Sequence, residues 1–255
     1  MTLMYRVFPE ISGMNLHVPV VQSTLPETPL IRFAETRVSA LEMDAAPRRT
    51  SRLDFYRLMV KRPLDILLSI VAIVLVAPVI GFLALALWIE SGNPFFSQER
   101  IGRNGRHFRM YKLRTMIPGA DRILEDCLRD NPALREEWAR TQKLKSDPRV
   151  TPLGRLLRRT SMDEIPQILN VLKGDMSLVG PRPMLPQQLA LYRRPEAYLA
   201  LRPGITGLWQ VTARNDASFE LRSRLDARYE ANVTLWMDFR IIRATFGAVF
   251  KATGY

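Results

Sequence analysis

Two adjacent carboxylates, Asp163 and Glu164, have the clearest potential for chemistry, because they lie in a run, 160–167, that also predicts a helix start. Pro166 lacks an amide hydrogen and is tolerated only in a first helical turn. We therefore place the N-cap at Asp163; the alternative is a capping box between Ser161 and Glu164. In either case the acids lie at the positive end of a helix dipole, which favours ionised carboxylates and attracts phosphate groups.

The surroundings of the acid pair favour an active site that handles phosphate groups at a bilayer surface. Basic residues lie around the pair in the sequence, and a long apolar segment precedes it. The spacing of the acids is also typical of an ordinary helix start, in which Asp163 is only a cap and Glu164 is only solvated. The chemical interpretation therefore depends on the elements that position the pair.

The composition narrows the function classes. The chain has 255 residues and a formal net charge of +12, which predicts one domain of ordinary size with appendages and an anionic partner. The candidate partners are nucleic acid, acidic lipid headgroups, or a nucleotide and a phospholipid substrate. A single cysteine, Cys127, excludes an internal disulfide and a multi-cysteine zinc cluster, and His17 and His107 lie far apart in the sequence. A bound metal is therefore expected to be a hard ion with oxygen ligands.

The uncharged interval 66–89 predicts a membrane segment. A helix of about 24 residues is long enough to cross a hydrocarbon core of roughly 30 Å. The segment lies too far from the N-terminus for a secretory signal, and no small-residue cleavage site follows it. The alternative is a buried helix of a soluble protein, although such helices rarely stay uncharged over this length.

Basic residues flank this segment on both sides, which favours a helix that enters the membrane and turns back. A straight crossing would place one basic cluster on the wrong side under the positive-inside tendency. Pro78 lies in the middle of the segment, where it removes a backbone hydrogen bond and can supply a bend. Spanning helices also contain proline, so a straight crossing is the alternative. The flanking residues are Arg48, Arg49, Arg52, Arg57, Lys61 and Arg62 before the segment, and Arg100, Arg103, Arg106, Arg109, Lys112 and Arg114 after it.

The rest of the chain is divided around this segment. Residues 1–55 carry scattered prolines without an apolar period and predict a loosely ordered tail. Residues 95–117 predict a β-hairpin, and residues 120–145 predict helix divided by Pro132. A basic amphipathic helix is predicted over 239–251, either in the headgroup layer or against the core.

Two turn-rich loops, 174–183 and 202–215, are rich in arginine. Prolines on both sides of Arg182 restrict its backbone and can direct its guanidinium, whose planar fork suits bidentate phosphate binding.

These residues occur in an order that resembles the bacterial sugar transferases, or monotopic polyprenyl-phosphate phosphoglycosyl transferases. The resemblance covers roughly residues 57–255. Larger members carry additional spanning helices ahead of this core, whereas this sequence has only a polar tail there and so resembles the short form of the family. The motifs that carry it are Lys61-Arg62-x-x-Asp65, the apolar segment with Pro78, Tyr111-Lys112-Leu113-Arg114-Thr115-Met116, Asp147-Pro148-Arg149, Ser161-Met162-Asp163-Glu164, Asn170-Val171-Leu172-Lys173-Gly174-Asp175-Met176-Ser177 and Gly180-Pro181-Arg182-Pro183.

The resemblance implies a helix-rich α+β fold that is membrane-associated, with one re-entrant, proline-broken helix and interfacial amphipathic helices. The expected units are the tail 1–55, the membrane anchor 56–94 and the catalytic domain 95–255. The expected location is the cytoplasmic face of the bacterial inner membrane. The implied partners are a UDP-sugar, polyprenyl phosphate and inner-membrane lipids, without nucleic acid, and a homodimer is compatible with them.

The implied reaction transfers a sugar 1-phosphate from a UDP-sugar, with a hexose favoured, to polyprenyl (undecaprenyl) phosphate and releases UMP. This reaction initiates exopolysaccharide, capsule or O-antigen synthesis. By analogy Asp163 is the nucleophile, which forms an acyl-phosphate intermediate, and Glu164 assists with the metal or a proton. Cations must shield the pyrophosphate for a carboxylate to attack it.

The resemblance also implies Mg²⁺ as cofactor and further site residues. The expected substrate-binding residues are Lys112, Arg114, Arg182 and Arg214, and the expected metal ligands are Asp163, Glu164, Asp226 and Asp238. Ala213 departs from the family pattern, which usually has glycine before Arg-Asn, and a side chain there can alter the loop that holds Arg214.

Two rival functions use the same features. The first is a membrane-anchored basic module that binds anionic lipid or nucleic acid without catalysis. The second is a membrane-associated hydrolase that uses the same acids with water as the acceptor.

Overall fold

The structure is a computed structural model that describes residues 55–141, 144, 146–192, 195–212 and 219–250. The predicted tail 1–55 lies outside the described residues except for Phe55, and so does Arg214.

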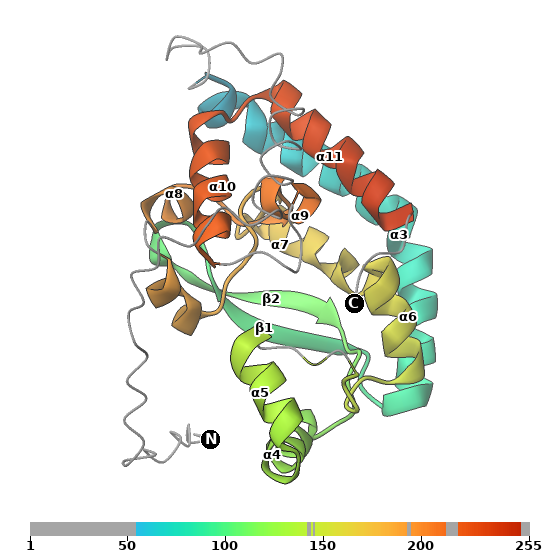
Figure 1. Cartoon of the computed structure of the whole chain (residues 1–255). Coiled ribbons are helices and arrows are strands. Elements are labelled where there is room, and N and C mark those ends of the chain that lie inside the picture. Colours follow the sequence, from blue (N-terminus) through green and yellow to red (C-terminus); the bar gives the residue numbers. More distant parts are fainter. Residues whose placement is uncertain (1–54, 142–143, 145, 193–194, 213–218, 251–255) are drawn as a thin grey trace, which may run out of the picture.

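The predicted membrane segment is part of one long helix. A π-helical turn, Tyr56–Val60, leads into α3, Lys61–Ser91, and the helical conformation continues through Pro78. The backbone therefore stays helical at this proline, while the long helix as a whole changes direction along its length (Figure 1). A proline removes only one hydrogen bond, and in apolar surroundings each further broken backbone hydrogen bond is costly, which favours continued helix on both sides.

The outer face of α3 is apolar and exposed. Tyr56–Ser91 is the one described helix that is long and apolar enough to cross a membrane, yet only 11% of its most apolar window is buried. This low burial argues against a core helix of a soluble protein. The large exposed side chains include Leu67, Val71, Val74, Leu75, Phe82 and Trp88.

The predicted hairpin is confirmed. Strands β1, Phe95–Ile101, and β2, His107–Leu113, pair in antiparallel register with Phe96 opposite Lys112. The connection has left-handed backbone at Asn104 and Gly105, which asparagine and glycine adopt most readily. The predicted division at Pro132 is also confirmed, since α4, Ala120–Asp130, ends just before α5, Pro132–Thr141.

Helix α6, Pro152–Thr160, is followed by a 3-10 helix, Met162–Gln167, and then by α7, Ile168–Lys173. Beyond them, the two arginine-rich loops contribute a parallel pair of short strands, β3, Ser177–Val179, and β4, Gly204–Thr206. A Cβ at Gly204 would lie 2.1 Å from the backbone nitrogen of Gly180, so this close approach requires glycine.

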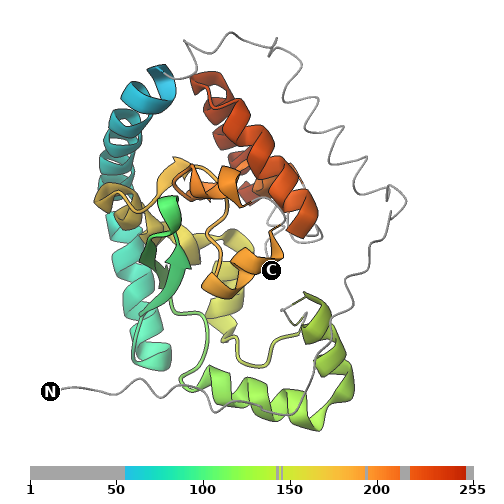
Figure 2. The same ribbon diagram turned by 90° about the vertical axis from the view of Figure 1, so that its left-hand side faces the viewer.

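The remaining elements close the domain around these strands. They are a 3-10 helix, Pro186–Leu191, and the helices α8, Glu196–Leu199, α9, Leu208–Thr212, α10, Phe219–Ala231, and α11, Leu235–Phe250. The last of these contains most of the C-terminal helix expected from the sequence. Helices α4 and α5 lie at one end of the molecule and α11 at the other, with the hairpin between them (Figures 1 and 2).

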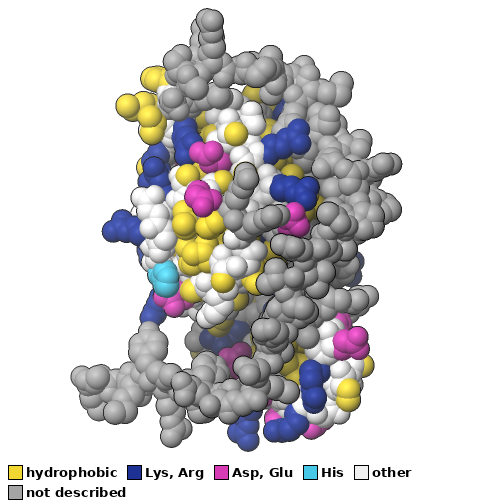
Figure 3. Space-filling model, turned by 60° about the vertical axis from the view of Figure 1, so that its left-hand side comes forward, with side chains coloured by type: hydrophobic (Ala, Val, Ile, Leu, Met, Phe, Trp, Pro, Cys, Tyr) yellow, Lys and Arg dark blue, Asp and Glu magenta, His cyan; other side chains and the backbone are white. Residues whose placement is uncertain are grey.

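Charges are dispersed over the surface that carries α8 and α10. On this face the basic side chains are interspersed with acidic and apolar ones (Figure 3). The high net charge is therefore not gathered into one patch on this face.

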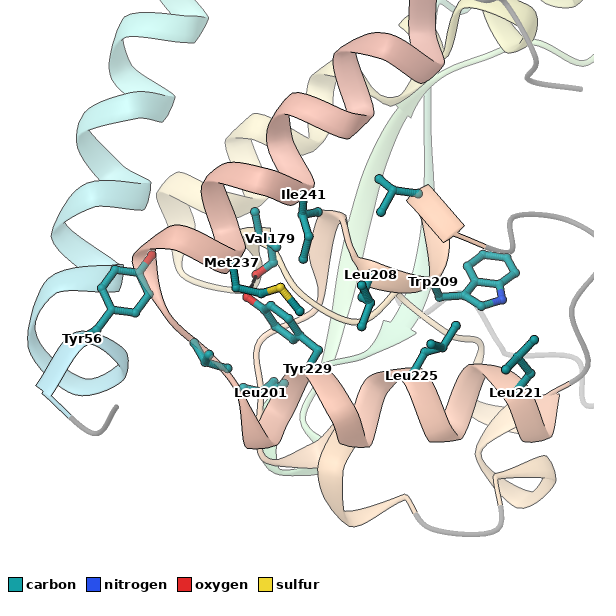
Figure 4. Packing of buried hydrophobic residues seen from close by; sticks show 12 residues of the cluster. Tyr56, Val179, Leu201, Leu208, Trp209, Leu221, Leu225, Tyr229, Met237 and Ile241 are labelled. Carbon is teal, nitrogen blue, oxygen red and sulfur yellow. Dashed lines mark hydrogen bonds between the residues drawn. The ribbon is translucent and has the colours of Figure 1, made fainter. Parts of the chain in front are cut away.

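The largest core cluster joins the C-terminal helices to the π-helical turn that leads into α3. Tyr229 of α10 and Ile241 of α11 are almost completely buried, and Tyr56 packs into the same cluster (Figure 4). Burial of such large apolar side chains contributes roughly 1.5–3 kcal/mol each. The long apolar helix is therefore an integral part of the fold.

Polar contacts fix the N-terminal end of α3 to the domain. Asp238 of α11 accepts hydrogen bonds from Tyr56 (2.7 Å), Lys61 (2.5 Å) and Tyr229 (2.6 Å). Asp65 accepts from the Ser177 hydroxyl at 2.6 Å.

The C-terminal part of α3 packs against the same domain. Leu83 and Leu87 form a buried cluster with Leu113 of β2 and Leu157 of α6. Both ends of the long apolar helix therefore contact one globular body.

Candidate active site

The acid pair lies in the 3-10 helix Met162–Gln167, with Asp163 buried and Glu164 partly buried. The N-cap position is Ser161, so the prediction of Asp163 as the cap is wrong. Ser161 has left-handed backbone (φ 57°), and its side chain makes no capping hydrogen bond, so the alternative capping box is absent as well. The first turn closes instead through the Glu164 amide, which donates to the Ser161 carbonyl at 3.2 Å.

Pro166 explains the tight winding of this helix. In an α-helix that starts after Ser161, the proline ring would crowd the carbonyl of Met162 four residues earlier. The 3-10 helix pairs residues three apart and avoids that arrangement. A helix does start at the acids, as the sequence predicts. Its first turn is 3-10, whereas the prediction of Asp163 as the cap presupposed an α-helical turn.

Lys112 of β2 is the cation nearest to the acids. Its Nζ atom lies 2.7 Å from Glu164 Oε1 and 3.7 Å from Asp163 Oδ2. Arg182 approaches Glu164 at 3.5 Å. The structure thus brings four predicted residues, Asp163, Glu164, Lys112 and Arg182, into one cluster.

Asn170 fixes β2 against the helices that carry the acids. Its fully buried side chain donates to the Arg109 carbonyl at 2.7 Å and accepts from the Tyr111 amide at 3.0 Å. Both contacts lie within three residues of Lys112. The position of Lys112 relative to the acid pair is therefore set by hydrogen bonds between the Asn170 side chain and the backbone of β2. These contacts were not predicted from the sequence.

The two carboxyl groups titrate differently. Burial raises the pKa of Asp163, the charge of Lys112 opposes this rise, and the negative charge of Glu164 adds to it. Burial also acts to raise the pKa of Glu164, but the charges of Lys112 and Arg182 outweigh it and lower the pKa to about 2. Neighbouring acids whose pKa values are pushed apart are typical of catalytic pairs with separate roles.

Two further arginines, Arg158 and Arg100, interact with the acids, and a third, Arg222, interacts with Arg182; none was assigned a role from the sequence. Arg158 of α6 interacts electrostatically with Asp163, and its Nε donates to Thr115 at 2.9 Å. Arg100 of β1 interacts electrostatically with Arg182 and Glu164, and Arg222 of α10 with Arg182. The Nε atoms of Arg100 and Arg222 are buried without a hydrogen-bond partner. A cluster with more guanidinium groups than carboxylates suits a dianionic or more highly charged ligand.

Two predicted residues have other contacts. Arg114 donates to the Phe95 carbonyl at 3.2 Å and lies over the Phe96 ring. Asp238 is occupied by its three donors, described above, and joins α3 to the C-terminal helices. These contacts do not test the expected roles of Arg114 in substrate binding and of Asp238 in metal binding, which stay predictions.

Asp226 of α10, the remaining expected metal ligand, has a partner outside that helix, and its role as a ligand also stays a prediction. It is buried and accepts a hydrogen bond from the Tyr192 hydroxyl at 2.9 Å. Burial raises its pKa to about 7, although that hydrogen bond and the charge of Arg222 oppose the rise. Among the described residues, no group of three or more His, Cys, Asp and Glu side chains is placed to hold a metal ion.

The comparisons with known proteins identify the family of this chain. The family model described as bacterial sugar transferase matches residues 56–252. The chain belongs to this family.

Several curated relatives are similar to this chain. The exopolysaccharide production protein ExoY of Sinorhizobium fredii is 43% identical over 196 residues, which cover 76% of this chain and 87% of the relative. An undecaprenyl-phosphate galactose phosphotransferase of Salmonella typhimurium is 42% identical over 76% of this chain and 41% of its own length. An undecaprenyl-phosphate glucose phosphotransferase of Komagataeibacter xylinus is 35% identical over 91% of this chain and 43% of its own length. The match spans less than half of the two larger relatives.

Proposed function

We propose that this protein is an undecaprenyl-phosphate sugar-1-phosphate transferase. It transfers a sugar 1-phosphate from a UDP-sugar, with a hexose favoured, to undecaprenyl phosphate, releases UMP and initiates exopolysaccharide, capsule or O-antigen synthesis. The observation that carries this proposal is the buried Asp163 beside Glu164 and Lys112, in a domain to which an exposed apolar helix is fixed. The names of the relatives, which include galactose and glucose phosphotransferases, support the reaction class and a hexose.

The mechanism has two displacements at one phosphorus atom. The Asp163 carboxylate attacks the phosphorus that bears the sugar, the bond to the bridging oxygen breaks, and UMP leaves with that oxygen. An oxygen of undecaprenyl phosphate then attacks the same phosphorus and releases the Asp163 carboxylate. Covalent catalysis of this kind replaces one difficult step by two easier ones.

Each neighbour of Asp163 has a role in this scheme. Lys112 and Arg182 place positive charge beside the acids and lower the repulsion between the carboxylate and the pyrophosphate. Glu164, with its low pKa, stays ionised and keeps Lys112 in position. Arg100 and Arg158 add positive charge around the same site, and Arg222 adds positive charge beside Arg182.

The acid pair fits the expected Mg²⁺. This ion usually binds one or two protein carboxylates and completes its octahedral shell with water and substrate phosphate oxygens. Asp163 and Glu164 supply hard oxygen ligands, so the absence of a third acid among the described residues does not conflict with this arrangement. When bound, the ion would neutralise charge on the phosphate groups.

The biochemical test uses the purified protein with labelled UDP-glucose or UDP-galactose and undecaprenyl phosphate. We expect equal amounts of UMP and lipid-linked sugar phosphate, and loss of turnover on removal of Mg²⁺ by a chelator. Without the lipid, label is expected to stay on the protein at Asp163. Continued turnover without lipid would identify a hydrolase, and no release of UMP from any UDP-sugar would favour a binding module.

We also propose that α3 does not span the bilayer and that both of its ends lie at the cytoplasmic face. The distance from Asp65 to Leu87 along a helix is about 33 Å, enough to cross the hydrocarbon core. Yet Asp65 binds Ser177 and Leu87 packs against Leu113 and Leu157, all in one domain. Contacts at both ends support a helix that lies along the domain with its outer face in lipid.

Cysteine labelling tests this topology. In a Cys127→Ser background, Phe55→Cys and Ser91→Cys report the two ends of the helix. An impermeant maleimide is expected to label both in inverted inner-membrane vesicles and neither in intact spheroplasts. The wild-type protein, which keeps Cys127 in α4 of the catalytic domain, is the separate control for the cytoplasmic side. Labelling of the two ends from opposite sides would show a spanning helix.

A further inference from the structure

An apolar cavity of about 300 Å³ lies between α3 and the acidic 3-10 helix with α7. Its lining is formed by apolar side chains and one glycine. The lining includes Ile73, Ala77 and Gly81 of α3, Ile165 and Pro166 of the 3-10 helix, and Leu169 of α7.

Some residues that line the cavity are direct neighbours of the site residues, either along the chain or across the hairpin. Ile165 and Pro166 directly follow Asp163 and Glu164 in the same 3-10 helix. Phe95 of β1 also lines the cavity, and its neighbour Phe96 is the register partner of Lys112. The acids and the apolar lining are therefore held by the same short elements.

The lining excludes the polar substrate. A nucleotide or a sugar would find no hydrogen-bond partners among these side chains, and burial of unpaired polar groups is costly. A hydrocarbon chain has no polar groups that would be left unpaired there, so it can move between the bilayer and this cavity without that cost. The outer face of α3 is exposed and apolar, so a chain that leaves the cavity along this helix stays in a hydrophobic environment.

We propose that this cavity holds the first isoprene units of the acceptor lipid and thereby directs its phosphate to the site. This inference rests on the proposed function and adds residues that select the acceptor. Ligand sites are usually about 300–1,000 Å³, so a cavity at the lower limit takes a short part of the chain and leaves the remainder in the bilayer.

Gly81 allows a test that fills the cavity without changing the catalytic residues. A Cβ at Gly81 meets no atom within 4 Å, so a larger side chain fits without a clash at its first carbon. Leucine is also a better helix former than glycine, which favours a folded variant. Gly247 of α11 likewise has no atom within 4 Å of a built Cβ, so Gly247→Leu is the matched control.

For Gly81→Leu we expect the KM for undecaprenyl phosphate to rise about tenfold or more, because the added side chain takes the space of an isoprene unit and an overpacked cavity resists it. Exchange of labelled UMP into the UDP-sugar, measured without lipid, is expected to stay at the wild-type rate. Gly247→Leu is expected to leave both quantities unchanged.

The two measurements separate this inference from the proposed function. Wild-type exchange of UMP with an unchanged lipid KM in Gly81→Leu would overturn the acceptor site and leave the proposed function intact. Equal loss of exchange and lipid transfer in Gly81→Leu, with the fold preserved by circular dichroism, would also overturn it, because the cavity would then serve the donor step. Absence of exchange in the wild type would contradict the phospho-aspartyl step itself.

Discussion

Asp163→Asn is expected to reduce release of UMP by about 10⁴-fold or more, as loss of the nucleophile does in other enzymes with covalent intermediates. Asparagine has nearly the same size as aspartate, so the buried position stays filled. Its amide lacks the negative charge needed to attack phosphorus. The measurement is UMP release with saturating UDP-sugar and undecaprenyl phosphate.

The control for this variant is Asp121→Asn, which changes an exposed aspartate in the first turn of α4. Full activity is expected for the control, and sedimentation with membranes is expected for both proteins. If Asp163→Asn retained wild-type turnover, the assignment of the nucleophile would be wrong.

Lys112→Met is expected to lower kcat about 10²-fold and to move the acidic limb of the pH–rate profile to higher pH. The charge of Lys112 lowers the pKa of both Asp163 and Glu164, so its removal raises both values. More Asp163 is then protonated, and inactive as a nucleophile, at a given acidic pH. Methionine keeps much of the volume of the lysine side chain, which separates the loss of charge from a loss of packing.

Stability provides a second measurement for Lys112→Met. The pKa of Glu164 is lowered from 4.5 to about 2 in the folded protein, so its ionisation stabilises the fold above about pH 4.5. This contribution is lost as the pH falls from about 4.5 towards 2. In Lys112→Met the contribution is expected to be smaller, and the difference in unfolding free energy between the two proteins is expected to narrow below pH 4.

The control here is Lys173→Met. Lys173 lies nearby and donates to the Tyr111 hydroxyl at 2.5 Å, but the acids are not its partners. We expect its pH–rate profile to match the wild type. An unshifted acidic limb in Lys112→Met would mean that Lys112 does not control the ionisation of the acid pair.

Local patterns predicted the elements well. The hairpin followed from two β-rich stretches around Gly102 to Gly105, and the break between α4 and α5 followed from Pro132. These features depend on a few neighbouring residues, so the sequence contains their cause. The same holds for the helix start at the acids and for the long apolar helix.

Long-range partners could not be predicted in this way. Nothing adjacent to Asp238 in the chain indicates that Tyr56 and Lys61 will reach it across about 180 residues. The buried contacts of Asn170 with the backbone of β2 likewise appear only when the chain is folded. The left-handed Ser161 was missed because serine rarely takes that backbone conformation.

The attachment of α3 at both ends has a consequence for how the protein responds to its lipid environment. A helix that crosses a bilayer tilts or shifts when the hydrocarbon thickness changes. A helix held at Asp65 and at Leu87 by the same domain cannot adjust in that way. If α3 stays in one leaflet as proposed, the protein itself sets the height of Asp163 above the lipid tails, and we expect turnover to depend little on acyl-chain length.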